Sequence, residues 1–282
     1  MVADTSIEIG GVTKAALLAD GGPGGPSGVR ELAAVALHEA FHVFQRARRP
    51  GWVGNEADLL LYPVTDAGLL GLRRRESAAL RRALAAADEA DAACWARVAL
   101  EARRERFAAM DSAFSAYERL TELNEGLATY VQRRAAGRTT VDIPETEFPP
   151  AAARNRSYAI GPALAFLLDR FRPGWHAALE EDDAQHLDAL LEAALDGRTS
   201  DAGRCGFGAD EAAVLERAAK DDAAAVVARR ARGLAHRHRG GERPAALAAG
   251  LRPPQRRARG RRPAAHAVPA PRQRGGGAEL DR

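Results

Sequence analysis

The chain has 282 residues, a hydrophobic content of 46% and an aromatic content of only 5%. The apolar content is ample for a core, so a wholly disordered chain is excluded. The formal net charge of +3 arises in residues 229–282, where fifteen Arg face three acidic residues, so the rest of the chain is net acidic. A uniformly basic nucleic-acid-binding protein is therefore excluded as well.

The cysteines and the apolar segments allow a prediction of the cellular compartment. Cys94 and Cys205 lie far apart with no C-x-x-C motif, and we expect two reduced thiols in a reducing compartment. The N-terminus lacks a basic region followed by an apolar stretch, so no signal peptide is expected. The longest uncharged apolar stretch, near residues 159–168, is too short to cross a bilayer. A cytoplasmic protein without membrane contact is predicted.

The first elements combine two strands and a helix. Residues 5–18 predict two short strands joined by a Gly-Gly turn. A Gly- and Pro-rich loop follows over residues 20–28, and Ser27 is the expected cap of the next helix. That helix is expected from about Val29 to Arg48, before Pro50-Gly51, and its composition is that of a buried helix.

The sequence of residues 52–233 predicts mainly helices. Residues 52–63 suggest a short helix that stops at Pro63, residues 65–118 are mostly helical, and the helix over 118–136 runs up to Gly137. The remaining expected segments are a Pro-rich loop (141–150), an apolar helix (about 152–171) and shorter helical segments (about 175–196 and 209–233). The predicted fold is mainly α, of the α+β class, with a small N-terminal β element and one domain over residues 1–233.

The C-terminal segment, residues 234–282, consists largely of Arg, Ala, Gly and Pro and contains no aromatic residue. Such a segment buries too little surface to order itself, and a disordered tail is predicted. Clustered Arg attracts phosphates, so a nucleic-acid-binding arm is the alternative, although no aromatic is present to stack on bases. The composition also suits GC-rich DNA translated in a wrong frame, which resequencing of the gene would test.

A His-Glu-x-x-His motif lies in the helix predicted after Val29. His38 and His42 are four residues apart and share one helix face, and neutral imidazole is a good zinc ligand. Glu39 can take a proton from a water molecule held at such a site. Three ionisable groups in a buried apolar helix need partners, which a metal ion supplies. The alternative is a core helix with two satisfied histidines.

Hydrolytic zinc sites normally have three protein ligands and a water, so a third ligand must come from elsewhere in the chain. Glu125 is the best candidate, because it lies in an apolar helical stretch and the adjacent Gly126 allows another helix to approach closely. Glu122, one turn earlier, is an alternative ligand or a partner for a ligating imidazole. Glu56 and Glu76 are lower-ranked rivals, and a plain surface carboxylate is the remaining interpretation of Glu125.

The combination of H-E-x-x-H at residues 38–42 with N-E-G-L-A-T-Y at residues 124–130 resembles the gluzincin metallopeptidases, especially those related to aminopeptidase N. This resemblance implies a zincin-like catalytic domain in which His38, His42 and Glu125 bind Zn²⁺. It also implies that Glu39 is the general base.

The spacing departs from that family, because 82 residues separate His42 from Glu125. The helical region 65–118 is then expected to be an insertion that leaves the two motif helices adjacent. The G-x-M-E-N type of motif, which contacts a free amino terminus in exopeptidases of this family, is missing. The resemblance therefore implies a zinc hydrolase of gluzincin type, and not specifically an aminopeptidase.

The activity implied is peptide hydrolysis on a peptide or protein substrate. A donor is needed for the charge that develops on the carbonyl oxygen, and Tyr158 is the candidate, with Tyr130 second. For either tyrosine the alternative is a packing residue with a satisfied hydroxyl. Two other functions remain open: a non-catalytic metal-binding helical protein, and nucleic-acid binding through the basic tail. The sequence does not predict the oligomeric state.

Overall fold

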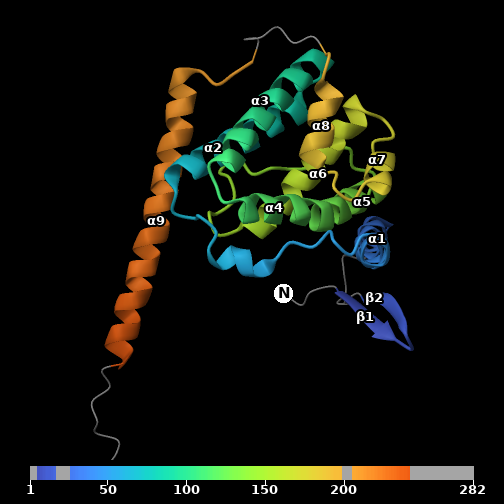
Figure 1. The fold of residues 1–282 in the computed structure, drawn as a ribbon, viewed down its shortest axis with the longest axis horizontal. Helices are drawn as coiled ribbons and strands as arrows, with labels where there is room; N and C mark the ends of the chain where they lie inside the picture. The colour runs from blue at the N-terminus through green and yellow to red at the C-terminus, as the bar shows by residue number, and fades with distance from the viewer. Residues whose placement is uncertain (1–4, 17–25, 199–204, 242–282) are drawn as a thin grey trace, which may run out of the picture. The chain divides into compact units, whose positions relative to one another are not determined.

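The computed structural model describes residues 5–16, 26–198 and 205–241. The chain divides into two units, Met1–Ala235 and His236–Arg282, and the elements described here belong to the first, apart from the end of the last helix. Helices make up most of the described residues, and one two-stranded hairpin is the sheet within them (Figure 1). The prediction of a mainly α protein with a small N-terminal β element is confirmed.

Strands β1 (Thr5–Ile9) and β2 (Val12–Ala16) pair antiparallel, with Ile9 opposite Val12. The two residues between them, Gly10 and Gly11, have φ values of 62° and 75°. A two-residue turn with positive φ at both central positions matches the twist of the flanking strands, and glycine adopts it without steric cost. The predicted hairpin is therefore confirmed, although residues 17 and 18 of the prediction lie outside the described residues.

Helix α1 (Pro26–Arg48) begins earlier than expected. Ser27 is consequently inside its first turn, and the prediction that Ser27 caps the helix is wrong. The face that carries His38 and Gln45 is buried, as expected. The opposite face is apolar yet open, with 68% of Val29 exposed, so the prediction of a buried helix holds for one face only. The other exposed apolar side chains there are Leu32, Leu37 and Phe44.

The segment after α1 contains a 3₁₀ helix, η1 (Glu56–Leu60), in place of the longer helix predicted over residues 52–63. Helices α2 (Ala67–Ala85) and α3 (Glu89–Ala108) then pack side by side (Figure 1). Asp66 and Asp88 precede these helices and accept hydrogen bonds from backbone amides of the first turn. An aspartate in this position satisfies donors that the helix itself leaves unpaired, which explains where each helix starts.

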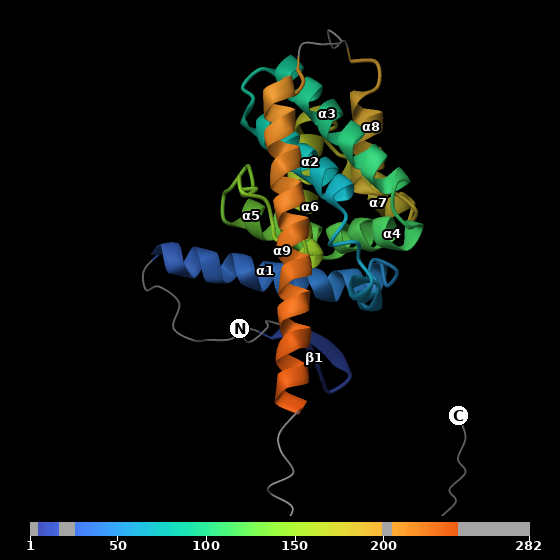
Figure 2. The same ribbon diagram turned by 90° about the vertical axis from the view of Figure 1, so that its left-hand side faces the viewer.

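The next helical stretch carries the second motif. Helix α4 (Ser112–Thr121) continues into a π-helical turn, η2 (Glu122–Gly126), and then into α5 (Leu127–Ala135). The prediction of uninterrupted helix over 118–136 missed this turn. Helix α1 packs along α5 (Figure 2), so the two motifs meet in space despite their separation in sequence.

The C-terminal half adds α6 (Ala153–Phe171), α7 (His176–Glu181), α8 (Leu187–Leu195) and α9 (Ala209–Gly241). The single segment predicted over 175–196 is thus two helices. Helix α9 continues past residue 233, so the prediction of disorder is wrong for residues 234–241. The remaining part of the predicted tail, with its proposed nucleic-acid contacts, lies outside the described residues.

Helix α6 and the π-helical turn are in direct backbone contact. A Cβ atom added to Gly126 would lie 2.7 Å from the Cα atom of Gly161, and one added to Gly161 would lie 2.6 Å from the Cα atom of Gly126. Real Cβ atoms do not approach other carbons so closely, so both positions require glycine. The expectation that Gly126 permits the close approach of another helix is confirmed.

Cys94 of α3 and Cys205, just before α9, form a disulfide with a Cα–Cα distance of 6.1 Å. The prediction of two reduced thiols is therefore wrong. Disulfides are typical of oxidising compartments, so the bond removes one reason for expecting a cytoplasmic protein. Among the described helices, none combines the length and apolar character needed to cross a bilayer.

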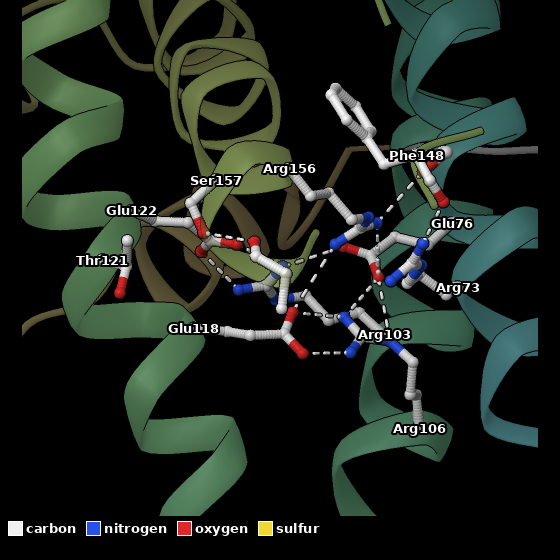
Figure 3. Close-up of polar contacts among 12 residues, drawn as sticks. Arg73, Glu76, Arg103, Arg106, Glu118, Thr121, Glu122, Phe148, Arg156 and Ser157 are labelled. Atoms are coloured by element: carbon white, nitrogen blue, oxygen red, sulfur yellow. Dashed lines mark hydrogen bonds and ion pairs between the residues drawn. The ribbon is translucent and has the colours of Figure 1, made fainter. Parts of the chain in front are cut away.

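A group of buried charges lies where α2, α3, α4, η2, α6 and α8 meet. We call it the arginine–carboxylate cluster, and its members are Glu76, Arg103, Arg106, Glu118, Glu122, Arg156 and Asp188. Figure 3 shows Glu118 and Glu122 extending from one helix toward Arg103 and Arg106 on another. Burial by itself raises the pKa of a carboxyl group, but Arg106 and Arg156 outweigh this effect and lower the pKa of Glu118 to about 2.

Replacing Gly161 with Ala tests the contact between α6 and η2. The added methyl group forces the two backbones apart, and we expect the free energy of unfolding to fall by about 1–3 kcal/mol, as for other overpacked interiors. Gly71→Ala in α2 is the matched control, because its methyl group would meet the Cβ atom of Ala219 at an ordinary 3.9 Å. Urea titrations followed by circular dichroism measure both, and equal losses in the two variants would contradict this account.

Candidate metal centre

Three donor atoms converge between α1 and the π-helical turn. Nε2 of His38 lies 3.1 Å from Nε2 of His42, and Oε2 of Glu125 lies 3.3 Å from the His42 nitrogen and 3.9 Å from the His38 nitrogen. The two histidines are brought together by their spacing of four residues on α1. Glu125 reaches them because α1 packs along the helix that follows η2. Only 7% of Glu125 is exposed, so it is not a surface carboxylate.

These separations suit a single bound cation. Zinc ligands at about 2.0–2.1 Å in tetrahedral geometry lie about 3.3 Å from one another, close to the distances observed here. Two imidazole nitrogens and one carboxylate oxygen also form the donor set typical of hydrolytic zinc sites. Within the described part of the chain, these three residues are the group of side chains that could hold a metal ion.

Gln45 selects the form of His42 that can bind a metal. Its side-chain NH₂ group donates to the backbone carbonyls of Leu123, at 2.8 Å, and Asn124, at 3.0 Å. The amide oxygen of Gln45 therefore faces His42 and lies 2.8 Å from Nδ1. Because this oxygen can only accept, Nδ1 of His42 must donate its proton, and in the neutral ring Nε2 keeps the free lone pair.

The two histidines differ in their electrostatic surroundings. Burial and the neighbouring His42 lower the pKa of His38, which favours the neutral ring. Burial also acts to lower the pKa of His42, but its hydrogen bond to Glu125 and the charge of that carboxylate raise it above the usual value. Hydrogen bonds to the Gln132 side chain and the Ala128 backbone act in the opposite direction and offset part of this lowering of the His38 pKa.

Arg154 and Tyr158 of α6 both bind Glu125. Nη2 of Arg154 donates to Oε1 of Glu125 at 2.6 Å, while Oε2 faces the histidines. Burial opposes ionisation of Glu125, but hydrogen bonds from His42 and Tyr158 lower its pKa, so the carboxyl group is ionised at neutral pH. Arg154 also pairs with Glu56, an exposed residue of η1.

The predicted catalytic side chains lie beside this group. Glu39 is 6% exposed, and its Oε1 atom is 4.0 Å from Nε2 of His38. The ring of Tyr158 stacks on that of His38, with centroids 6.4 Å apart. Burial and the hydrogen bond to Glu125 raise the pKa of Tyr158 well above its usual value, so its hydroxyl stays protonated.

The rival candidates have other partners. Both carboxylate oxygens of Glu122 bind Arg103, and Glu76 lies within the arginine–carboxylate cluster, so neither is free to bind a metal. Glu56 is held by Arg154 and Tyr117 and does not reach the histidines. Tyr130 donates to Asp169, as expected of a packing tyrosine with a satisfied hydroxyl.

Gln45 and Arg154 were missed by sequence reasoning. Gln45 could have been found, because it lies three residues after His42 and seven after His38, on the same helix face, where a second polar partner for a ligating imidazole is needed. Arg154 carried no comparable signal, since its contact with Glu125 depends on how α6 crosses η2.

No protein-family model, curated protein or solved structure matches this chain.

The third ligand is tested by Glu125→Gln, with Glu56→Gln as the matched control on the neighbouring carboxylate. We expect Glu125→Gln to weaken zinc binding by more than the ~10–100-fold that follows loss of an outer partner of a ligand. Glu56→Gln should change the affinity far less, because Glu56 reaches the site only through Arg154. Competition with a chromophoric zinc chelator measures both, and unchanged affinity in Glu125→Gln would remove Glu125 from the site.

Replacing Gln45 with Leu removes the acceptor that orients His42. We expect the zinc affinity to fall by about 10–100-fold, because the imidazole can then adopt the other tautomer or rotate. Gln185→Leu serves as the control, since this exposed amide bonds to Asp182 away from the histidines. The same competition assay applies, and equal affinity in both variants would show that the bond to Gln45 has no role.

Proposed function

We propose that this protein is a zinc-dependent hydrolase that cleaves peptide bonds. One observation carries the proposal: His38, His42 and Glu125 converge in a buried group, with Glu39 next to the first histidine on the same helix. The resemblance of the two motifs to gluzincin metallopeptidases supports the same assignment of roles. The same resemblance implies that the substrate is a peptide or protein.

His38, His42 and Glu125 are the residues that would hold the ion. When bound, zinc polarises a carbonyl group and lowers the pKa of a water molecule to about 7. Glu39 accepts the proton of the attacking water and then passes it to the leaving amine, which is general base followed by general acid catalysis. Its burial beside His38 keeps bulk water from competing for that proton.

Tyr158 supplies a donor for the charge that develops on the carbonyl oxygen during attack. Its hydroxyl donates to Glu125 in the structure, so its one proton turns from that carboxylate to the carbonyl oxygen during attack. The raised pKa of Tyr158 keeps the hydroxyl protonated at neutral pH. Arg154 places a fixed positive charge next to it, because the two side chains are hydrogen bonded. A preorganised donor in a partly buried site stabilises such charge more strongly than water does.

The general base is tested by Glu39→Gln. We expect zinc affinity close to that of the unaltered protein and a loss of peptide cleavage of at least ~10²–10⁴-fold, the usual contribution of a positioned base. The matched control is Glu31→Gln on the same helix, where the carboxylate pairs at the surface with Arg138. Mass spectrometry of a mixed peptide pool measures cleavage, and metal analysis measures zinc.

The outcomes separate this proposal from its main alternative, a metal-binding helical protein without catalytic activity. That alternative predicts bound zinc in all three proteins and no cleavage by any of them. Cleavage that persists in Glu39→Gln would instead leave the hydrolase in place and remove Glu39 as the base.

A further inference from the structure

The spacing of three acidic residues poses a geometric problem for the metal centre. Glu118, Glu122 and Glu125 follow one another at intervals of four and three residues, and a regular α-helix would place all three on one face. In the structure the first two face the arginine–carboxylate cluster, whereas Glu125 faces His42. The π-helical turn Glu122–Gly126 accounts for this difference, because its wider turn rotates Glu125 away from the face that carries Glu118 and Glu122.

Glu122, the first residue of this turn, is held by Arg103. Nη1 and Nη2 of Arg103 donate to the two carboxylate oxygens of Glu122, at 3.0 and 2.5 Å. Arg103 itself is fixed from two other helices, by Glu76 of α2 at 2.8 Å and by Asp188 of α8 at 3.1 Å. Only 2% of Arg103 is exposed, so water does not compete for these bonds. The start of the turn is thus bound to a buried guanidinium group that two other helices also bind (Figure 3).

Two further contacts hold the rest of the turn. The amide of Gln45 binds the carbonyls of Leu123 and Asn124, and Gly126 lies against Gly161 of α6. A π-helical turn is rare and is retained where surrounding contacts favour it over continuous α-helix. Within this turn, Glu125 is the residue whose side chain reaches the histidines.

We infer that Arg103 is a positioning residue for the metal centre: by binding Glu122 at the start of the π-helical turn, it holds the turn in the conformation that aims Glu125 at His38 and His42. Arg103 touches neither the histidines nor Glu125. Its effect on metal binding therefore acts through the backbone of the turn. This inference rests on the metal centre proposed above and goes beyond it, because it assigns a role to α3, which contributes no ligand.

Arg103→Lys is the most direct test. Lysine keeps the positive charge, but a single ammonium group cannot bind both oxygens of Glu122 while also bonding Glu76 and Asp188. We expect zinc affinity to fall by about 10–100-fold, the range found for partners that orient a ligand. The cobalt-substituted protein should also change its visible absorption, which reports the coordination geometry.

Arg73→Lys is the matched control, because Arg73 is equally buried but bonds to Glu147 and to the carbonyls of residues 148–150, not to the turn. It should keep the zinc affinity and the cobalt spectrum.

The measurements should be made at a pH well above the pKa of Glu122. Burial raises this pKa to about 7, although the charge of Arg103 acts to lower it. Circular dichroism establishes that each variant is folded. If Arg103→Lys does not fold, Glu122→Gln replaces it, since it keeps the shape and removes the charge that binds Arg103.

A double-mutant cycle with Glu125→Gln separates positioning from general loss of stability. If Arg103 acts through Glu125, removing the Glu125 carboxylate costs less zinc affinity in the Arg103→Lys background than in the unaltered protein. Additive losses, an equal loss in Arg73→Lys, or a folded Arg103→Lys variant with unchanged affinity would each overturn the inference. Zinc binding without peptide cleavage would remove the proposed hydrolase but leave this inference to be decided by the binding data.

Discussion

Two imidazole nitrogens and a carboxylate oxygen repel one another when their lone pairs face each other in a buried site. Such a group is stable only if a cation or protons lie between the lone pairs. In this protein the three atoms lie within 4 Å of one another, and their neighbours point the lone pairs inward instead of relieving the crowding. Gln45 occupies the far side of the His42 ring, and Arg154 occupies the outer oxygen of Glu125. The helices around the site thus hold an arrangement that a bound cation, or a proton shared by His42 and Glu125, would make favourable.

The segment between the two motifs contributes to this arrangement. Residues 65–118 could be regarded as an insertion that merely leaves the motif helices adjacent. In the structure α3 supplies Arg103 and Arg106, which bind Glu122 and Glu118 just before the second motif, and Glu76 of α2 binds both arginines. Buried ion pairs contribute little net stability when they replace apolar packing, so their value here lies in fixing one conformation of the π-helical turn.

The acidic residues of this region divide into two groups with different environments. Glu76, Glu118, Glu122 and Asp188 are surrounded by guanidinium groups, which occupy their oxygens. Glu39 and Glu125 lie beside imidazoles, whose protonation can change near neutral pH. This division explains why several carboxylates occur so close together while only one completes the group with His38 and His42.

The sequence by itself determined what depends on neighbours along the chain. Glycines at 10 and 11 specify the hairpin, the spacing of His38 and His42 places both on one helix face, and Gly126 marks a close helix crossing.

Tertiary structure alone decided the rest. Four acidic residues were candidates for the third ligand, and packing of α1 along α5 places Glu125 beside the two histidines. The sequence did not predict this choice, because a contact across 82 residues leaves no local periodic signal. The π-helical turn was hidden for the same reason: its sequence has helical periodicity, and its register is held by Arg103, Gln45 and Gly161 from other helices. The Cys94–Cys205 bond likewise depends on which chain segments meet, which cysteine spacing does not reveal.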